Sequence, residues 1–179
     1  MILHICCAPC GGACVERVKE EKLTPVLYYS NSNLNSAEEF ERRLESVRKL
    51  AADEQIELYV DPYDHDAWLQ AVAGLENEPE QGERCRKCFR FSLSRCAKFA
   101  EGRDFCTTLT VSPHKNSGVI FDIGSEWENF VPNDFKKRDG YRRSCEIARQ
   151  SGFYRQKYCG SEFSLTHSGG KNEDNISGQ

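Results

Sequence analysis

Six cysteines in three groups have the spacing that metal ligands show. The groups are Cys6-Cys7-Ala-Pro-Cys10, Cys85-Arg-Lys-Cys88 and Cys159. Two thiolates separated by two residues can face one metal ion, and the start of a helix favours their negative charge. One such pair alone also fits a thioredoxin-like redox pair or half of a zinc site. Two pairs with further cysteines predict a metal site.

The same cysteines narrow the choice of metal. Zinc in a closed four-cysteine site would use four thiols and leave two of the six without a role. Iron–sulfur clusters are also bound by thiolates, and a cluster plus a second metal would use the surplus. Iron–sulfur chemistry is therefore favoured, with zinc as the alternative. Cys6 and Cys7 are adjacent, so both can bind one ion only if the chain turns there.

The chain has ten cysteines, and the other four are interpreted as structural. These are Cys14, Cys96, Cys106 and Cys145, which fall on presumed inner helix faces or inside a strand, where free cysteine acts as a small hydrophobe. The N-terminus reads as a strand rather than a signal peptide, and no apolar run is long enough to span a membrane. We therefore expect a cytoplasmic protein whose thiols serve metal or redox chemistry rather than disulfides.

These cysteines must be positioned by a sheet with helices around it. Strands are expected at 1–5, 25–30, 56–60, 105–111 and 131–135, and helices at 11–22, 36–51, 66–73, 84–101, within 117–130 and at 140–151. This alternation predicts an α/β fold, a parallel sheet with helices on both faces. We expect one domain over 1–166 and a mobile C-terminal tail over 167–179.

Ligands bind at the carboxyl ends of the strands in such sheets. Cys6, Cys7, Asn31, Asp61 and Ser112 all lie at or just past a predicted strand end. The sequence therefore predicts that these residues converge at one edge of the sheet.

The charge is unevenly distributed along the chain. A net charge of −4 argues against a protein that coats nucleic acid nonspecifically. Two basic runs, 84–98 and 136–157, nevertheless lie beside the cysteine motifs. They predict a face that docks on RNA, the alternative being solvated helix faces.

Five sequence blocks carry a resemblance to a known family. In chain order they are LHICCAPCG, GLENEPEQGERCRKC, TTLTVSPHKNS, DFKKRDGYRRS and GFYRQKYCG. They closely resemble the epoxyqueuosine reductase QueH family over residues 2 to about 164. The resemblance implies a Rossmann-like fold of the PP-loop/HUP type, a 4Fe–4S cluster and an additional mononuclear iron. It also implies reductive deoxygenation of the epoxide of epoxyqueuosine, at the tRNA wobble position, to give queuosine. CCAPCGG stands where a PP-loop enzyme has its phosphate loop, so ATP binding is not expected.

Carried over position by position, the resemblance implies six metal ligands: Cys6, Cys7, Cys10, Cys85, Cys88 and Cys159. Many relatives have aspartate at the position of Cys10. The family usually has Cys-Gly-Cys where this chain has Cys159-Gly160-Ser161. Either Cys10 completes the ligand count or one position stays open. Our hypothesis places Cys85, Cys88, Cys159 and one of Cys6 or Cys7 on the cluster. The other of that pair would hold the iron with Cys10.

Further residues are candidates for catalysis and substrate binding. Cys10, His114, Lys115 and Tyr158 are assigned to catalysis, the last three as proton donors. Asn31, Asn33, Lys115, Tyr154 and Arg155 are assigned to substrate. The cations would meet phosphate and the tyrosines would stack on a splayed base. The alternatives are an exposed loop for His114, half-buried tyrosines, and a turn for the two asparagines, which ranks first for them.

Two other functions remain open from the sequence. One is a zinc-stabilised tRNA-binding module without redox activity, and the other is a thiol–disulfide oxidoreductase that uses Cys85 and Cys88. The favoured reading requires epoxyqueuosine-containing tRNA as substrate and an electron donor that the sequence does not identify. Colour distinguishes them, because an iron–sulfur protein purified without oxygen is brown.

Overall fold

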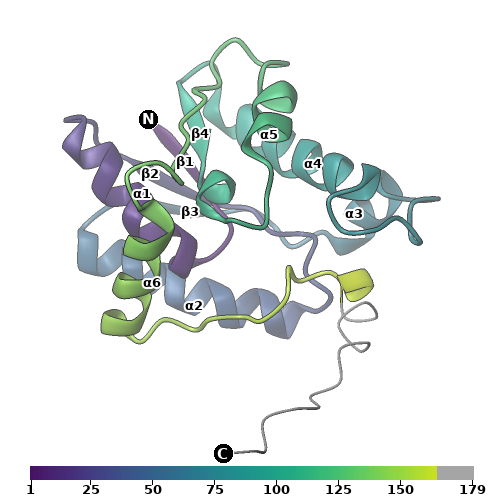
Figure 1. Ribbon diagram of the computed structural model, residues 1–179, viewed down its shortest axis with the longest axis horizontal. Helices are drawn as coiled ribbons and strands as arrows, with labels where there is room; N and C mark the ends of the chain where they lie inside the picture. Colours follow the sequence, from purple (N-terminus) through teal and green to yellow (C-terminus); the bar gives the residue numbers. More distant parts are fainter. Residues whose placement is uncertain (165–179) are drawn as a thin grey trace, which may run out of the picture.

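The computed structural model describes residues 1–164 and contains a parallel sheet with the strand order β3-β2-β1-β4 (Figure 1). The strands are β1 (Ile2–Ile5), β2 (Val26–Tyr29), β3 (Leu58–Val60) and β4 (Phe105–Thr107). All four residues of β1 are buried, as expected of a central strand covered on both faces. The last dozen or so residues, predicted to be a mobile tail, lie outside the described residues.

Helices cover both faces of this sheet, which confirms the predicted α/β, Rossmann-like architecture (Figure 1). They are α1 (Ala8–Glu20), α2 (Ala37–Glu54), α3 (His65–Ala71), α4 (Glu83–Ala100), α5 (Ser117–Gly124) and α6 (Gly140–Ser151). On one face, Leu3 and Ile5 of β1 pack with residues of α1, α2 and α6. On the other face, Ile2 packs with residues of α4 and α5. This alternation follows from the two-residue period of a strand.

Helix α1 begins three residues earlier than the sequence indicated. Cys7 is its N-cap, with extended backbone angles, and Pro9 lies in the first turn. Proline is favoured there because its missing N–H would have no helical partner. The chain bends at Cys6, one residue before this N-cap. The first helix therefore follows the first strand almost directly.

The predicted start of α2 is confirmed in detail. The Ser36 hydroxyl accepts a hydrogen bond from the Glu39 backbone N–H at 3.1 Å. This is the first half of a capping box, with Ser36 as the N-cap and Glu39 three residues later. The helix ends at Gln55, which adopts the left-handed conformation.

Two predicted strands differ from the structure. The strand expected at 105–111 stops at Thr107 and continues as a short 3-10 helix, η1 (Thr108–Val111). The Thr107 hydroxyl accepts from the Leu109 N–H at 3.2 Å, which caps that turn. The strand predicted at 131–135 is wrong, because the chain touches β4 only through an isolated bridge from Phe130 to Phe105.

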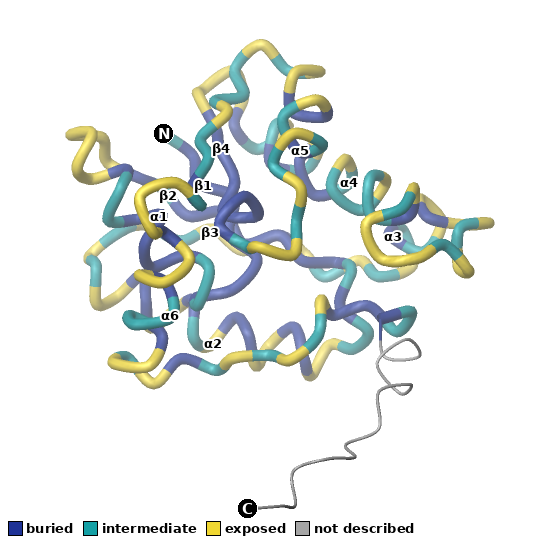
Figure 2. The backbone as a smooth tube through the Cα atoms, viewed as in Figure 1, coloured by how far each residue is buried: buried dark blue, intermediate teal, exposed yellow. Residues whose placement is uncertain are grey.

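Burial follows the layers of the fold. The strands and the inner helix faces are buried, and the connecting loops are exposed (Figure 2). Strand β3 lies at the edge of the sheet, where Tyr59 and Val60 remain exposed. Within residues 1–164, no helix has the length and apolar character needed to cross a bilayer.

Candidate active site

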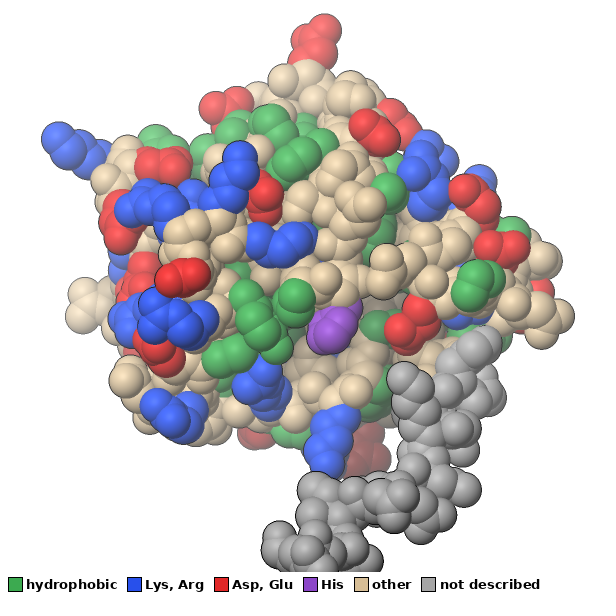
Figure 3. Space-filling view, in the orientation of Figure 1, with side chains coloured by type: hydrophobic (Ala, Val, Ile, Leu, Met, Phe, Trp, Pro, Cys, Tyr) green, Lys and Arg blue, Asp and Glu red, His purple; other side chains and the backbone are tan. Residues whose placement is uncertain are grey.

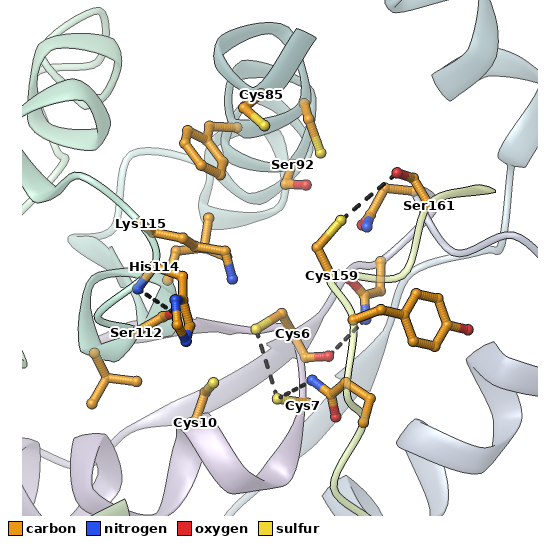
Figure 4. A pocket seen from close by; sticks show the side chains of 18 of the residues that line it. Cys6, Cys7, Cys10, Cys85, Ser92, Ser112, His114, Lys115, Cys159 and Ser161 are labelled. Carbon is orange, nitrogen blue, oxygen red and sulfur yellow. Dashed lines mark hydrogen bonds between the residues drawn. The ribbon is translucent and has the colours of Figure 1, made fainter. Parts of the chain in front are cut away.

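A cavity of about 450 Å³ opens where β1 and β2 end, at their carboxyl ends. Its walls come from the start of α1, the first turns of α4, the loop after η1 and the irregular segment 153–161, which we call the strap (Figure 4). All six cysteines predicted as metal ligands line it: Cys6, Cys7, Cys10, Cys85, Cys88 and Cys159. Tertiary structure thus gathers three cysteine groups that are far apart in the sequence.

The predicted convergence at the sheet edge holds for four of its five residues. Cys6, Cys7, Asn31 and Ser112 line the cavity, but Asp61 does not. Asp61 is instead bound by the Arg95 guanidinium and accepts a hydrogen bond from the Ser30 hydroxyl at 2.7 Å. A buried carboxylate needs such partners, and the arginine directs it away from the cavity.

Cys6, Cys7 and Cys10 form a close thiol triad. Their sulfur atoms all lie within 4.8 Å of one another, and the Cys6 and Cys7 sulfurs are 4.0 Å apart. The bend at Cys6 supplies the turn that these neighbours need, and Cys10 follows within the first turn of α1. A metal–thiolate bond is about 2.3 Å long, so sulfurs on one metal lie within about 4.6 Å. The three thiols are therefore close enough to bind one metal ion or two adjacent metal centres after small shifts.

The other three thiols belong to the opposite wall. Cys85 and Cys88 are three residues apart on α4, so they share one face of the helix. Cys159 enters from the strap, and Figure 4 shows it between Cys85 and the triad. The Ser161 hydroxyl is 3.7 Å from the Cys159 sulfur. Ser161, where the family resemblance led us to expect a cysteine, thus lies inside the site and next to Cys159.

Hydrogen bonds within the triad separate the acidities of its thiols. The thiols of Cys10 and Cys7 hold the pKa of Cys6 well below its usual value, and the Lys115 charge acts in the same direction. The Cys10 thiol lowers the pKa of Cys7, but its hydrogen bond to Cys6 and its burial outweigh this and raise it to about 11. Donation to Cys6 also raises the pKa of Cys10. Cys6 is therefore the first of the three to become a thiolate.

On the α4 wall, burial dominates the thiol acidities. It raises the pKa of Cys85, and it raises the pKa of Cys88 to about 12. A buried thiol of this kind is inert without a cation to stabilise its thiolate. These two residues thus have the properties of ligands that ionise when a metal binds.

Lys115 is the cation that faces the Cys6 thiol. Its side chain is half-buried and points toward Cys6 (Figure 4). Burial lowers the pKa of its ammonium group, but the thiols of Cys6, Cys10, Cys7 and Cys159 raise it by more. Lys115 therefore remains charged at neutral pH. His114, its neighbour, is exposed at the cavity wall.

Three supporting residues were missed by the sequence analysis. His4 lies in β1 below Cys6, 1% exposed, and burial lowers its pKa. Its Nε2 donates to the Ser30 carbonyl at 3.1 Å, so its Nδ1 accepts from Thr107 at 2.8 Å. Gln156 Nε2 donates to the Cys7 sulfur at 3.3 Å.

Arg43 is the third of these residues. It is 2% exposed, forms an ion pair with Glu39, and donates to the Cys159 carbonyl. Its position in the sequence could have indicated its burial, because Arg43 directly precedes Leu44 on the apolar side of α2. The signal for His4 and Gln156 was their place inside two of the sequence blocks.

Most of the residues predicted to bind substrate or transfer protons line the cavity, but some of them already have hydrogen-bond partners in the protein. Asn33 and Arg155 line the cavity, as do Asn31 and Tyr158. Asn31 Nδ2, however, donates to the Cys6 carbonyl at 2.6 Å. The Asn31 carbonyl accepts from the Leu34 N–H at 3.2 Å, which closes a turn over Asn33, as the turn interpretation that ranked first predicted. The Tyr158 hydroxyl donates to the Asn35 side chain at 3.1 Å. Tyr154 is not brought to the cavity, because its hydroxyl donates to Glu39 at 3.1 Å.

Of the four cysteines interpreted as structural, three are buried in the core and one lines the cavity. Cys14, Cys96 and Cys106 are buried in the core, as expected. Cys145 is only half-buried and forms part of the cavity wall, where its sulfur lies 3.2 Å from Arg155 Nη2. The reason is that α6 packs on α1 through Ile147, which leaves Cys145 facing the cavity.

Six of the nine arginines in the two predicted basic runs form ion pairs, including Arg86 with Glu83. Ion pairs join Arg90 to Glu126, Arg95 to Asp61, Arg138 to Glu20, Arg142 to Asp139 and Glu146, and Arg143 to Glu16. Within residues 1–164, Lys157 and Lys115 have no carboxylate within salt-bridge distance, and both line the cavity. Figure 3 shows lysine and arginine side chains scattered around a hollow that hydrophobic side chains border. Lys115 and Lys157 therefore give the cavity two cations that no described carboxylate neutralises.

Comparison with known proteins agrees with this site. The family model described as "Epoxyqueuosine reductase QueH" matches residues 1–167. A protein of that name from Streptococcus pyogenes serotype M1 is 35% identical over 94% of this chain and 71% of its own length. Another from Acinetobacter baylyi is 32% identical, over 92% and 80%. A third from Thermotoga maritima is 31% identical, over 92% and 90%. The chain belongs to the epoxyqueuosine reductase QueH family.

Proposed function

We propose that this chain is an oxidoreductase that converts epoxyqueuosine in tRNA to queuosine, with residues 1–166 as a single metal-binding reductase domain. One observation carries the proposal: six thiols from three separate segments of a QueH family member line one cavity. We expect the reaction to take place in the cytoplasm, with tRNA as the partner and a separate protein or cofactor as electron donor.

The donor set fits a 4Fe–4S cluster and an additional mononuclear iron. A cubane cluster takes four thiolates, and Cys85, Cys88 and Cys159 supply three from one side of the cavity. The triad of Cys6, Cys7 and Cys10 lies opposite and would supply the fourth, leaving two thiols for the lone iron. When bound, these centres would supply electrons and a Lewis-acid position for the epoxide oxygen.

The reaction consumes two electrons and two protons. Both C–O bonds of the epoxide break, a carbon–carbon double bond forms in the five-membered ring, and the oxygen leaves as water. Lys115 is the best placed residue to donate a proton, because it stays charged and points into the site. Water has a pKa of about 15.7, so the departing oxygen is a stronger base than an amine. His114 lies at the same wall and could relay the second proton from solvent.

Substrate recognition would use the cavity and its rim. A volume of about 450 Å³ suits one modified base extruded from the anticodon loop. Asn33 lies on the wall and would contact that base, while Lys115 and Arg155 would meet phosphate. Tyr158 could present its ring but not its hydroxyl, which Asn35 already accepts. The stacking role predicted for Tyr154 would require it to leave Glu39.

The test combines composition and turnover. The protein is purified without oxygen, analysed for iron and sulfide, and mixed with epoxyqueuosine-containing tRNA and a chemical reductant. We expect about five irons for every four sulfides, and queuosine after a single turnover. Zinc without sulfide and no conversion would instead support the zinc-stabilised tRNA-binding module.

The partition of ligands is tested by two substitutions in the same preparation. In Cys10→Ser we expect loss of about one iron per chain with sulfide retained, because Cys10 is assigned to the lone iron. In Cys88→Ser we expect loss of sulfide. Loss of the whole cluster signal in Cys10→Ser would contradict this partition.

A further inference from the structure

A buried ion pair on α2 lies directly behind the strap. Arg43 and Glu39 are 2% and 7% exposed, and Arg43 Nε is 2.7 Å from Glu39 Oε1. Burying two charges costs so much desolvation that such a pair is weak evidence for stability. Stability alone therefore does not explain why these two charges are buried here. The other contacts of Arg43 and Glu39 suggest a different role.

The guanidinium of Arg43 reaches the strap at the metal-ligand position. Nη1 donates to the Cys159 carbonyl at 3.2 Å, and the guanidinium carbon lies 5.4 Å from the Tyr158 ring centroid. Arg43 also forms part of the cavity lining. One side chain thus connects helix α2, the strap backbone and the site.

The strap depends on such contacts because it has no helix or strand hydrogen bonding from Phe153 to Cys159. Its backbone at Gly160 lies against Arg43: a Cβ there would be 3.2 Å from both Nη1 and Nη2. Gly160 also has a φ of +123°, which only glycine adopts readily. The Gly160 carbonyl accepts from the Asn35 N–H at 2.9 Å, so both anchors lie on the α2 side.

Glu39 holds both the arginine and the start of the strap. Its carboxylate accepts from Arg43 Nε and from the Tyr154 hydroxyl. Its own backbone N–H is bound by Ser36, which fixes the first turn of α2. The contacts form a continuous chain from the helix cap to the Cys159 peptide.

We propose that Arg43, oriented by Glu39, is a positioning residue that fixes the strap and holds the Cys159 thiol at the cavity. Its polar contacts run to the Glu39 carboxylate and to the Cys159 carbonyl, so the role assigned to it is positioning rather than catalysis. The consequence for the cofactor rests on the proposed function, but the anchoring of the strap does not.

The test measures amide hydrogen exchange of the strap in the protein as purified without oxygen. Arg43→Met should accelerate exchange across 154–161 by about tenfold, because it removes a charged hydrogen bond. Arg42→Met is the matched control on the same helix: Arg42 is exposed and lies over the Tyr154 ring at 5.2 Å. It removes only this ring contact at Tyr154 and no hydrogen bond to the strap backbone, so it should leave the exchange of 157–161 unchanged.

Two further variants cover the case in which Arg43→Met fails to fold with Glu39 unpaired. Glu39→Gln combined with Arg43→Met removes both charges and should show the same faster exchange while amides of α1 keep their protection. Arg43→Lys keeps the charge but not the reach to Cys159. In this variant the amides of α2 should regain their protection, while hydrogen exchange in the strap should remain faster than in the unchanged protein.

A second readout follows the site itself. Release of iron to a chelator, recorded by absorbance, should be about tenfold faster in the double variant than in Arg42→Met. Strap exchange unchanged in the double variant, or equally fast in Arg42→Met, would overturn the proposal. Faster strap exchange in a protein that does not convert epoxyqueuosine would leave the positioning role intact and reject only the proposed function.

Discussion

At the scale of single residues, the Lys115 ammonium group and the thiols around it stabilise each other's charged forms. Lys115 points toward Cys6 and keeps its proton because the thiols around it favour the charged form. The same charge favours the Cys6 thiolate. The residue can thus hold a negatively charged centre and supply a proton to a departing oxygen.

Replacing Lys115 by methionine tests the proton-transfer role. Single-turnover conversion of epoxyqueuosine should fall by about 100-fold or more, the usual contribution of a positioned acid. Iron content should stay near that of the unchanged protein. Lys87→Met, on the exposed side of α4, is the control and should convert normally. Equal conversion in both variants would exclude Lys115 as a required donor.

Gln156 contributes through a hydrogen bond to sulfur. Its amide donates to the Cys7 sulfur, and such bonds stabilise the more negative, reduced state of a metal centre. Gln156→Leu removes about 1 kcal/mol of that stabilisation, equivalent to a fall of about 40 mV in a one-electron potential. Spectroelectrochemical titration measures it. Gln150→Leu, on the exposed part of α6, should leave the potential unchanged, and an unchanged potential in Gln156→Leu would contradict the assignment.

At the scale of elements, the cavity depends on how α6 packs against α1. Ile147 of α6 lies where a Cβ on Gly12 would stand, so the two helices approach closely. Helix α6 starts at Gly140, and a Cβ there would overlap the Phe135 carbonyl oxygen. Because a backbone atom occupies that space, no side chain can move aside to relieve the overlap.

Gly140→Ala should therefore lower the free energy of unfolding by about 3 kcal/mol, the range of severe overpacking. Urea denaturation measures it. Gly118→Ala, at an exposed position in α5, should change stability by no more than about 0.5 kcal/mol. A similar loss in both variants would contradict the role of the contact with Phe135, because alanine itself favours a helix more than glycine does.

At the scale of the whole molecule, the surface charge is arranged by ion pairs. The arginines of both basic runs mostly face acids, whereas Lys115 and Lys157 at the cavity have no ion pair among the described residues. We expect tRNA affinity to fall with salt, and Lys157→Met to reduce the slope of log K against log salt by about 1. Lys98, near the far end of α4 from Cys85, is the control. A slope that changes equally in Lys98→Met would place the docking surface elsewhere.

Stability should depend on pH through His4 at the centre of the sheet. Burial lowers its pKa below 6.5, so the unfolded chain binds a proton more readily than the folded one. Stability from this residue is complete above pH 6.5 and falls as pH decreases toward the folded-state pKa, by up to about 1.4 kcal/mol per pH unit. His4→Asn should lack this part of the slope. Urea midpoints at pH 7.5 and 5.5 compare the two proteins, and equal slopes would contradict a neutral His4.

Much of this protein was determined by the sequence alone. Strand β1, the capped start of α2 and the three cysteine groups follow from patterns within a few residues of one another. Parallel alternation then implied one ligand-binding edge, and Cys6, Cys7 and Asn31 do meet there. Local spacing suffices for such features because period, capping and C-x-x-C geometry are local physical constraints.

Only the tertiary structure decided which distant side chains meet. Gln156 binds the sulfur of a cysteine 149 positions away, and Arg43 binds a carbonyl 116 positions away. Packing also turned Asp61 toward Arg95 and Tyr154 toward Glu39, away from the cavity. Such contacts depend on the exact approach of whole elements, because hydrogen bonds and ion pairs act over only about 3 to 4 Å. No spacing along the chain carries that information.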